Sequence, residues 1–570
     1  MKISLKILFL TFAGVVWSVC CTAQDRYSDY RTMMQKINTL SGDYPALCTS
    51  RSLAKTAGGK EVIVITIGTG DKENKPGIAI FGGIEGSHIL GRELALGFAS
   101  SILKESESSE IKALLGKITF YVFPDVSPDA AEQFFAGLKY ERIFNSAQTD
   151  DDRDFLNEED PFEDLNSDGL ITLIRVSDPA GTYSESDEDK RVMVPADLSK
   201  GQTGSFFVYS EGIDNDKDQK FNEDGPGGVS FNRNLTYNYE EFGINAGLYP
   251  VSEVETKAVL DFLFDHFNIY VTFAFGPQDN LGQPMRATER SGSAQTSAQT
   301  QMPAQGQFPP TGQMPVQGQM RMTGQQRKIT SILNSDEVIN KLVSDKYHEI
   351  TGIKGAPASR TPPGNFMEWS YFHYGRYSFS TPAWWFPAER DKNAEVAFLK
   401  YADENKMDDV FVPWTEIKHP DFPDKKTEAG GIKPFATINP PAEKLGELVS
   451  NNYKFIVAIA AMHPELEFLD VNVENKGDNI YRLSLKVHNK GIFATCSEAG
   501  EVNMWTRIMR ISLETSGSQK FLSGQKTQRI QRLEGDQSAE FSWLINGKGS
   551  IKITAGAVNT GMITTSVELK

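Results

Sequence analysis

Residues 77–88, with the sequence GIAIFGGIEGSH, decide the fold of this 570-residue chain. The apolar run 77–81 predicts a buried strand, and the apolar spacing of residues 89–103 predicts a helix directly after it. The same two patterns recur along the chain. Further buried strands are expected at residues 62–67, 118–123 and 269–275, and further helices at 251–266 and 337–348. This alternation predicts an α/β fold, a sheet with helices on its faces.

The first residues have the pattern of an export signal. Two lysines precede an apolar run over residues 7–19, and small residues precede Gln24 at a cleavage site. The run is too short for a comfortable membrane span, and no later stretch approaches the roughly 20 apolar residues that a span needs. We therefore expect residues 1–23 to be a signal peptide and the protein to be exported, periplasmic or extracellular, without a transmembrane segment.

Charge and cysteine content exclude two classes. The net charge of −17 argues against a nucleic-acid partner, which requires a basic face. Beyond the signal, Cys48 and Cys496 lie near opposite ends of the chain, which excludes a disulfide framework and leaves one bridge between them open.

Composition divides the rest of the chain. The α/β domain, which we call the body, is expected over residues 24–445. Two segments of different composition interrupt it. Residues 150–228 are rich in Asp, Glu, Asn and Gly, which favours a long loop organised by ions over a packed element. Residues 291–328 are Gln- and Met-rich and are predicted to be disordered. Short strands with period-two alternation predict an antiparallel β-sandwich over residues 455–570.

Acidic runs in the first interruption predict calcium. Residues 164–172, DLNSDGLIT, follow the first nine positions of a calcium loop, with oxygen ligands at alternate positions and Gly169 at the sharp turn. Position twelve is Arg175, so an acidic closure must come from elsewhere. Two further runs repeat the alternation without the glycine. A solvated acidic surface is the alternative. The predicted ligands are Asp164, Asn166, Asp168 and Thr172; Asp214, Asp216, Asp218, Asn222 and Asp224; and Asp150, Asp152, Asp154 and Glu158.

Four blocks resemble, in order, segments of the zinc carboxypeptidases of the carboxypeptidase A type. Residues 81–88, FGGIEGSH, resemble their GGIHxxE segment, and residues 228–234, GVSFNRN, resemble GVDLNRN. Residues 249–256, YPVSEVET, resemble YPxSExET, and EWSY at 368–371 with YSFS at 377–380 resemble DWSY and YSFT. The resemblance covers about residues 60–440. It implies an α/β fold with a mixed sheet flanked by helices, and zinc as the family's cofactor.

The resemblance breaks at the catalytic positions. The family holds zinc through two His and one Glu, and a separate Glu moves protons. Glu85 stands at the first His position and His88 at the Glu position. The second His is missing near residues 271–276, where Gln278 and Asp279 are the nearest polar groups. Pro382 occupies the position of the general base. We therefore expect a chain that binds rather than cleaves.

Recognition of a carboxylate is retained on the same comparison. The family's Asn-Arg pair clamps the substrate's terminal carboxylate, and Asn232 and Arg233 match it. A second family arginine corresponds loosely to Arg142, and the mobile substrate tyrosine falls roughly at Arg360. The predicted partners are therefore peptide or protein C-termini. Alternatively, Arg233 pairs with the acidic insertion.

Two other functions stay open. An active zinc metallocarboxypeptidase, acting in proteolysis, would need a rearranged metal site built from Glu85, His88 and Asp279, which must converge within about 2–2.3 Å of one point. A surface docking protein would instead act through the β-sandwich. Deleting residues 455–570 would then abolish partner binding.

Overall fold

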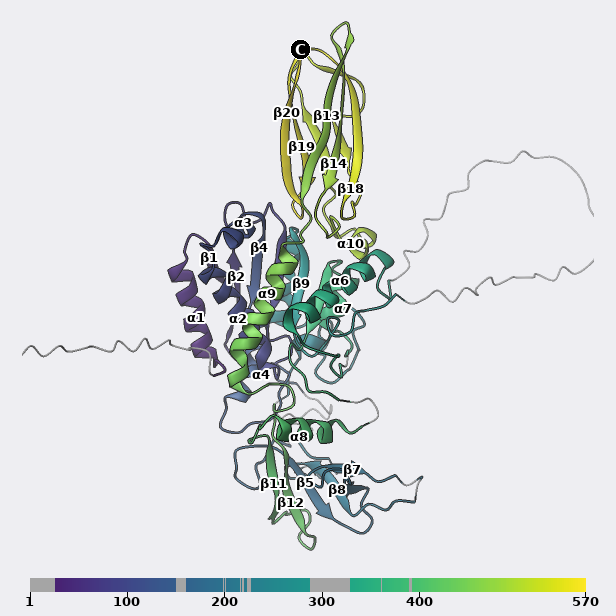
Figure 1. The fold of residues 1–570 in the computed structure, drawn as a ribbon. Coiled ribbons are helices and arrows are strands. Elements are labelled where there is room, and N and C mark those ends of the chain that lie inside the picture. The colour runs from purple at the N-terminus through teal and green to yellow at the C-terminus, as the bar shows by residue number, and fades with distance from the viewer. Residues whose placement is uncertain are drawn as a thin grey trace, which may run out of the picture.

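A computed structural model describes residues 26–149, 160–197, 199, 201–215, 217, 220–222, 227–287, 329–359, 361–388 and 392–570. Figure 1 shows three parts arranged one above another: a C-terminal pair of sheets, a central α/β body and a smaller sheet. Several predictions fall outside the described residues: the signal peptide, the segment 291–328, Arg360, and the calcium ligands Asp150, Asp152, Asp154, Glu158, Asp216, Asp218 and Asp224.

The body is built on a six-stranded mixed sheet. In spatial order its strands are β1 (Cys48–Lys55), β2 (Glu61–Ile67), β4 (Thr119–Phe123), β3 (Gly77–Phe81), β9 (Ile269–Phe275) and β10 (Tyr377–Thr381). The strands β4, β3, β9 and β10 run parallel, whereas β1 and β2 are antiparallel to their neighbours. The predicted α/β fold with a mixed sheet is confirmed, because the apolar runs are the buried strands that the pattern indicated.

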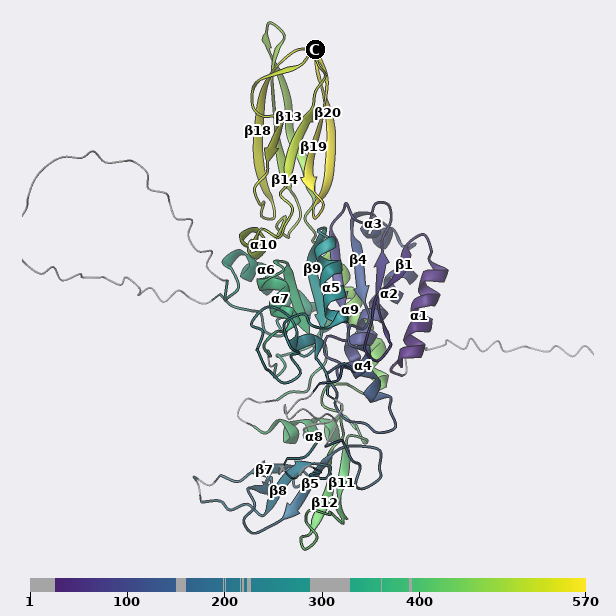
Figure 2. The same ribbon diagram turned by 180° about the vertical axis from the view of Figure 1, so that it is seen from behind.

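Helices cover both faces of this sheet. One face packs against α1 (Tyr30–Asp43), α2 (Ile89–Lys104), α3 (Ser109–Lys117), α6 (Asn334–Thr351) and α9 (Leu445–Ala460), as seen in Figure 1. The other packs against α5 (Val254–Asp265) and α7 (Phe366–Phe372), seen from behind in Figure 2. Side chains alternate along each strand, so Ile63 and Ile65 join the first core while Val62 and Val64 join the second. This double burial explains the continuous apolar runs.

The acidic interruption contains packed strands, which the composition did not predict. The strands β5 (Leu173–Ser177), β6 (Tyr183–Glu185), β7 (Met193–Pro195) and β8 (Phe206–Ser210) form one sheet with β11 (Phe411–Ile417) and β12 (Thr427–Ile432). We call these six strands the insertion sheet. Its central strand β5 is short and buries only Ile174, Arg175 and Val176, so its apolar signal is weak in a polar stretch. Residues 173–210 are therefore not the ion-organised loop that we expected.

The C-terminal region forms two packed antiparallel sheets, as predicted. One has the order β13 (Leu466–Gly477), β14 (Ile480–Asn489), β18 (Gln537–Asn546) and β16 (Lys520–Ser523). The other has the order β17 (Thr527–Arg529), β15 (Arg510–Glu514), β19 (Gly549–Ala557) and β20 (Gly561–Leu569). Inward-facing residues such as Leu483, Ile511 and Trp543 make a separate core. The predicted body boundary at 445 is where α9 begins, and α9 packs into the body's core.

A buried carboxylate ties the sandwich to the body. Asp336, near the start of α6, is 1% exposed and accepts hydrogen bonds from Tyr371 Oη (2.8 Å) and from the backbone N–H groups of Glu498 (2.9 Å) and Ala499 (3.1 Å). Glu498 begins the short helix α10 (Glu498–Asn503), which belongs to the C-terminal region. The guanidinium of Arg532 lies 3.8 Å from the same carboxylate. The two parts therefore share a polar junction.

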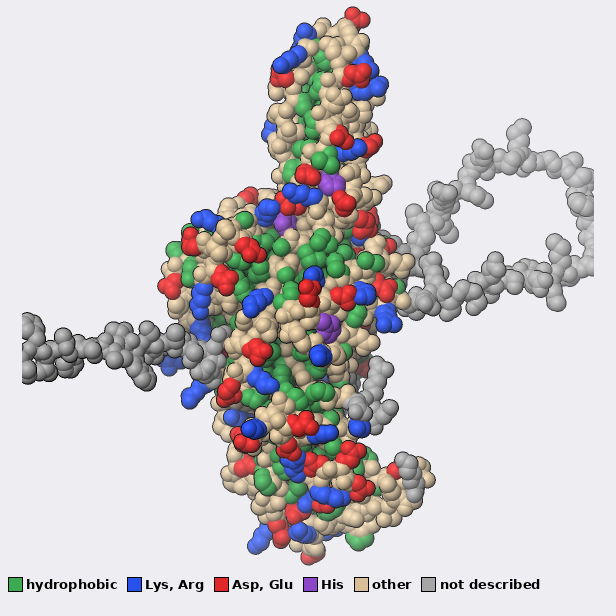
Figure 3. Space-filling model, in the orientation of Figure 1, with side chains coloured by type: hydrophobic (Ala, Val, Ile, Leu, Met, Phe, Trp, Pro, Cys, Tyr) green, Lys and Arg blue, Asp and Glu red, His purple; other side chains and the backbone are tan. Residues whose placement is uncertain are grey.

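Surface charge and cysteines add two observations. Acidic and basic side chains are interspersed on the face drawn in Figure 3, so the net charge of −17 does not form one acidic field there. Cys48 and Cys496 are free thiols in this structure. Within the described ranges, no helix has the length and apolar character needed to cross a membrane.

Candidate functional site

The candidate site lies at the carboxyl ends of β3, β9 and β10, where the GIAIFGGIEGSH stretch turns into α2. Gly83 has a φ of 65°, and a Cβ there would lie 2.1 Å from Asp125 Oδ1, so the turn requires glycine. Asp125 in turn lies 2.7 Å from Arg92 Nε of α2, with both side chains almost fully buried. The turn is thus fixed on both sides, and it presents Glu85 and His88.

Glu85 is hydrogen-bonded to the predicted carboxylate clamp. Asn232, in a short 3-10 helix (Phe231–Arg233), donates from Nδ2 to Glu85 Oε2 at 3.0 Å and to Gln278 Oε1 at 2.7 Å. Asn232 Oδ1 accepts from the N–H of Phe366 at 3.0 Å, so both ends of the fully buried amide are used. Burial raises the pKa of Glu85, while Asn232 and the nearby charge of Arg233 act to lower it. The three polar side chains form a closed group.

His88 points at a different partner. Its Nε2 lies 3.2 Å from the carbonyl oxygen of Pro382, directly after β10, and because a carbonyl only accepts, Nε2 carries the proton. Its Nδ1 is buried and has no hydrogen-bond partner in the described part of the chain. Burial lowers the pKa of His88 to about 4, so the ring is neutral at neutral pH. The structure therefore brings together His88 and Pro382, the two residues that the sequence resemblance predicts at a zinc-ligand position and at the base position.

These donors do not fit a catalytic zinc. Zinc in such sites takes three protein ligands from His, Asp, Glu and Cys and keeps one position open. Glu85 is held by Asn232, His88 is turned to Pro382, and the third polar group is the amide of Gln278. Across the described ranges, no group of three or more His, Cys, Asp or Glu side chains is arranged to hold a metal ion.

Asp279, the third ligand of the rearranged-site alternative, is used elsewhere. Its carboxylate accepts from the N–H groups of Gly282 and Gln283, both at 2.9 Å, and of Leu281 at 3.4 Å. Burial raises its pKa to about 6. The side chain therefore closes its own loop.

The two predicted clamp arginines differ in how they are engaged. Arg142 donates to the carbonyl oxygens of Phe144 (3.1 Å) and Asn145 (2.6 Å) and to Ser146 Oγ (2.9 Å), so it braces its own loop. Arg233 donates only from Nη1 to the carbonyl oxygen of Ile244, at 3.1 Å, and its shielded Nε has no partner among the described residues. Arg233 therefore keeps most of its donors for a ligand, and Arg142 does not.

The first predicted calcium loop is closed by hydrogen bonds. Asp164 accepts from the N–H groups of Asp168 (3.1 Å) and Gly169 (2.7 Å), and Asn166 Oδ1 accepts from Asp168 N–H at 2.9 Å. Thr172 donates from its N–H (3.0 Å) and its hydroxyl (2.7 Å) to Glu211 Oε2.

Glu211, directly after β8, is fully buried and also accepts from the N–H groups of Leu165 (3.1 Å) and Asn166 (3.3 Å). Burial raises its pKa. Glu211 is thus the acidic group that reaches this loop from elsewhere.

The described ligands of the second calcium run have protein partners. The N–H of Asn222 donates to Asp160 at 2.5 Å, and its Nδ2 donates to Ser210 Oγ (2.6 Å) and to the carbonyl oxygen of Glu211 (2.8 Å). The N–H of Asp214 donates to Asp421 at 3.1 Å. The run therefore packs against β8 and the loop between β11 and β12.

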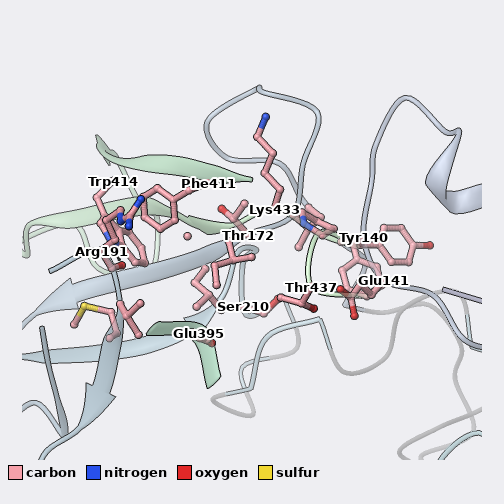
Figure 4. Close-up of a pocket in the computed structure, with 18 residues that line it drawn as sticks. Tyr140, Glu141, Thr172, Arg191, Ser210, Glu395, Phe411, Trp414, Lys433 and Thr437 are labelled. Atoms are coloured by element: carbon pink, nitrogen blue, oxygen red, sulfur yellow. Dashed lines mark hydrogen bonds between the residues drawn. The ribbon is translucent and has the colours of Figure 1, made fainter. Parts of the chain in front are cut away.

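A cavity of about 420 Å³ lies between the insertion sheet and the body. Figure 4 shows Phe411 and Trp414 of the insertion sheet on one side and Tyr140 and Glu141 of the body on the other, with Thr172 between them. Burial raises the pKa of Glu141, and its charge contributes to the raised pKa of Glu85. Glu85, Asn232 and Arg233 are not among the residues that line this cavity.

Sequence reasoning missed Glu211, Glu141 and the role of Asn232. Glu211 and Glu141 stand outside any motif, and only the folded chain brings them to the calcium loop and to the cavity. The bond between Asn232 and Glu85 joins two of the matched blocks, so it follows from their shared presence only once the strand order is known.

Two family models and one characterised protein match parts of this chain. A family model described as zinc carboxypeptidase matches residues 33–382, more than half of the chain, and a model described as a domain of unknown function matches residues 465–568. Carboxypeptidase E of Caenorhabditis elegans is 25% identical over 111 residues, which are 19% of this chain and 24% of that protein. The match thus spans about a quarter of that relative's length.

Two solved carboxypeptidase-related structures are among those similar to this chain. Bovine thrombin-activatable fibrinolysis inhibitor, in complex with tick carboxypeptidase inhibitor, is 14% identical with a TM-score of 0.39, over 77% of this chain and 98% of that chain. Carboxypeptidase A from Helicoverpa armigera is 12% identical with a TM-score of 0.38, over 76% of this chain and 74% of that chain.

Proposed function

The chain belongs to the zinc carboxypeptidase family, and we propose that it is a non-catalytic member that binds the C-terminal carboxylate of a peptide. One observation carries the proposal: Asn232 bridges Glu85 and Gln278, at 3.0 and 2.7 Å, where the family gathers its metal ligands. With Pro382 at the base position, the described site has no acid or base placed to move a proton for hydrolysis.

Arg233 supports carboxylate binding. A guanidinium presents five N–H donors, and Arg233 uses one of them on Ile244. Its planar fork matches a carboxylate with two parallel hydrogen bonds. In this proposal Arg233 binds the carboxylate without help from Asn232 or Arg142, whose donors are already used.

Binding calorimetry with a pair of peptides tests the proposal. The peptides share one sequence, and one ends in a free carboxylate while the other ends in an amide. We expect the free carboxylate to bind at least about tenfold more tightly, and Arg233→Ala to remove that difference, because the charged pairing is lost. Arg482→Ala, on the exposed face of the sandwich, is the control. Equal binding of both peptides, or release of the C-terminal residue by the purified chain, contradicts the proposal. The second result supports the rearranged metallopeptidase instead.

Calcium binding at the Asp164 loop is part of the proposal. The support is Glu211, which supplies the carboxylate that is missing at position twelve of the loop. Calcium would compete there with the backbone N–H groups for Asp164 and Glu211.

Export is proposed on the pattern of residues 1–23. Fractionation of cells that express the full chain tests it. A cytoplasmic product of full length contradicts it.

A further inference from the structure

Two arginines face each other on the outer surface of the sandwich. In the antiparallel pair β15 and β17, Arg510 lies directly opposite Arg529, so both side chains are on the same face. That face is the solvent side, because the neighbours Ile511 and Leu513 point into the core and both arginines are exposed. Like charges directly opposite each other destabilise a sheet. In the absence of a ligand this pair therefore costs stability.

A third arginine joins the pair from the segment before β15. The Arg507 guanidinium carbon lies 3.7 Å from the ring centroid of Phe267, a residue of the body just before β9. Stacking holds the guanidinium plane and leaves its N–H edges for other partners. Across the described residues, none of the three arginines makes an ion pair or a side-chain hydrogen bond. This contrasts with the neighbouring Arg532, which pairs with Glu534 and Asp336.

The arginines border a hollow at the junction of sandwich and body. A cavity of about 540 Å³ is lined by Arg507 and Arg510, by the hydroxyl-bearing Ser512 and Thr554, and by Asn74 of the body. Gly556 stands opposite Arg510 on β19 and also lines this cavity. An adjoining cavity of about 290 Å³ is lined by Arg507 and Arg529. The three arginines therefore line two neighbouring cavities that share Arg507.

The charge balance of this region calls for an anion. Glu514, the outward-facing carboxylate on the same strand, pairs with Lys552 at 3.1 Å, and Glu501 in the adjoining cavity makes no ion pair with these arginines. Within the described residues, the three arginines therefore have no carboxylate partner. Guanidinium forks bind phosphate oxygens in pairs, and hydroxyl groups donate to the remaining oxygens.

We propose that Arg507, Arg510 and Arg529, with the hydroxyls of Ser512 and Thr554, form a binding site for a phosphate group. The site is built at the amino ends of β3 and β9, where Asn74 and Phe267 lie, whereas Glu85 and Arg233 lie beyond the carboxyl ends. It therefore does not depend on peptide binding. The phosphate is carried by a small soluble molecule or by a lipid headgroup, because both present the same oxygens.

Thermal unfolding of the full chain tests the site with three probes at constant ionic strength: inorganic phosphate, glycerol 3-phosphate, and vesicles of phosphatidylglycerol in phosphatidylcholine. Sodium chloride is the reference. We expect at least one probe to raise the unfolding midpoint above that in chloride. A response to soluble phosphates identifies a small ligand, and co-sedimentation with the anionic vesicles alone identifies a lipid headgroup. The absence of a response to all three probes overturns the proposal.

Single substitutions separate a binding role from a structural one. Arg510→Gln and Arg529→Gln should each weaken the response about tenfold or more. In chloride alone they should raise the unfolding midpoint, because the opposed charges are relieved. Arg482→Gln, on the outer face of the other sheet, should change neither quantity. A lower midpoint in chloride with an unchanged phosphate response would show that the pair serves the fold alone, and would refute the site.

Discussion

The carboxylate of Glu85 accepts a hydrogen bond at 3.0 Å from the side-chain amide of Asn232. The sequence resemblance predicted separate tasks for these two positions, metal ligation and recognition of the substrate's carboxylate, and the structure joins them in one buried group. The bond consumes a donor that would otherwise face a ligand and an acceptor that would otherwise face a metal.

Removing the Asn232 amide should destabilise the fold. Asn232→Ala removes one hydrogen bond each from Glu85 Oε2, from Gln278 Oε1 and from the N–H of Phe366, and each buried group left unsatisfied costs about 1–3 kcal/mol. We expect a loss of about 3 kcal/mol or more in urea unfolding. Asn405→Ala, whose amide donates to Tyr401 at an exposed helix end, should cost less than about 1 kcal/mol. Equal losses of stability in the two variants would mean that the hydrogen bonds of the buried Asn232 amide contribute no more than that of an exposed amide.

His88 should make the protein sensitive to acid. Its pKa in the folded protein is about 4, below the ordinary 6.5, so the unfolded chain takes up the proton first as the pH falls. The stability gained by a neutral His88 is complete above pH 6.5 and is lost on acidification to pH 4, at most on the order of 3 kcal/mol. Burial raises the pKa of Glu85, which acts in the opposite sense.

The measurement is urea unfolding at pH 7 and pH 4.5. His88→Gln keeps a donor for the Pro382 carbonyl and should lose less stability between these values than the unmodified chain. His488→Gln, on the sandwich, is the control. A parallel decline in all three proteins would exclude His88 as the cause.

Elemental analysis should find no stoichiometric zinc. The purified protein is dialysed with trace zinc and calcium, and we expect far less than one zinc per chain, because Glu85 and His88 do not converge with a third ligand. Glu85→Ala should leave the content unchanged. One zinc per chain that disappears in His88→Ala would instead establish a metal site and require a carboxypeptidase assay.

Calcium should stabilise the insertion sheet. Thermal unfolding in calcium should occur at a higher midpoint than in chelator, because the ion binds the folded loop only. Glu211→Gln should weaken this response by about tenfold or more, since it removes one negative charge from the loop. Asp187→Asn, on the fully exposed turn between β6 and β7, should keep it. Identical midpoints with and without calcium would assign the acidic runs to solvent.

Asp336 should hold the sandwich to the body. Asp336→Ala leaves the hydroxyl proton of Tyr371 and two backbone N–H groups without their acceptor at the junction, and we expect a loss of about 3 kcal/mol or more. In calorimetry, one unfolding transition should separate toward two. Asp345→Ala removes an exposed helical ion pair with Lys341 on the same helix and should cost less than about 1 kcal/mol. Unchanged unfolding in both variants would mean that the junction is held by other contacts.

The strands were predictable from the sequence where both of their faces are buried. Runs such as Val62–Val64 and Ile269–Phe275 are covered by helices on both faces, so their hydrophobicity alone marks them as strands. Strand β5 escaped prediction because its partners β8 and β12 bury only a few of its residues.

The sequence predicted which residues lie at the site, but it did not predict which contacts their side chains make. Motif spacing placed Glu85, His88, Asn232 and Pro382 at the site. It could not reveal that Asn232 would bond to Glu85, that His88 would face Pro382, or that Arg142 would turn to its own loop, because each depends on side-chain direction in the folded chain.

The insertion sheet joins strands that lie far apart in the sequence and are therefore synthesised at different times. Arg175 of β5 donates to Glu428 of β12 at 2.8 Å, and the two residues are 253 positions apart. During synthesis at about 5–20 residues per second, β12 is completed roughly 10 to 50 seconds after β5 and β8. In that interval β5 presents an unpaired edge, a template for wrong pairing with other chains. During that interval, the negative charges of the Asp and Glu residues in this segment would repel other nascent chains. This repulsion would limit wrong strand pairing until β11 and β12 have been synthesised.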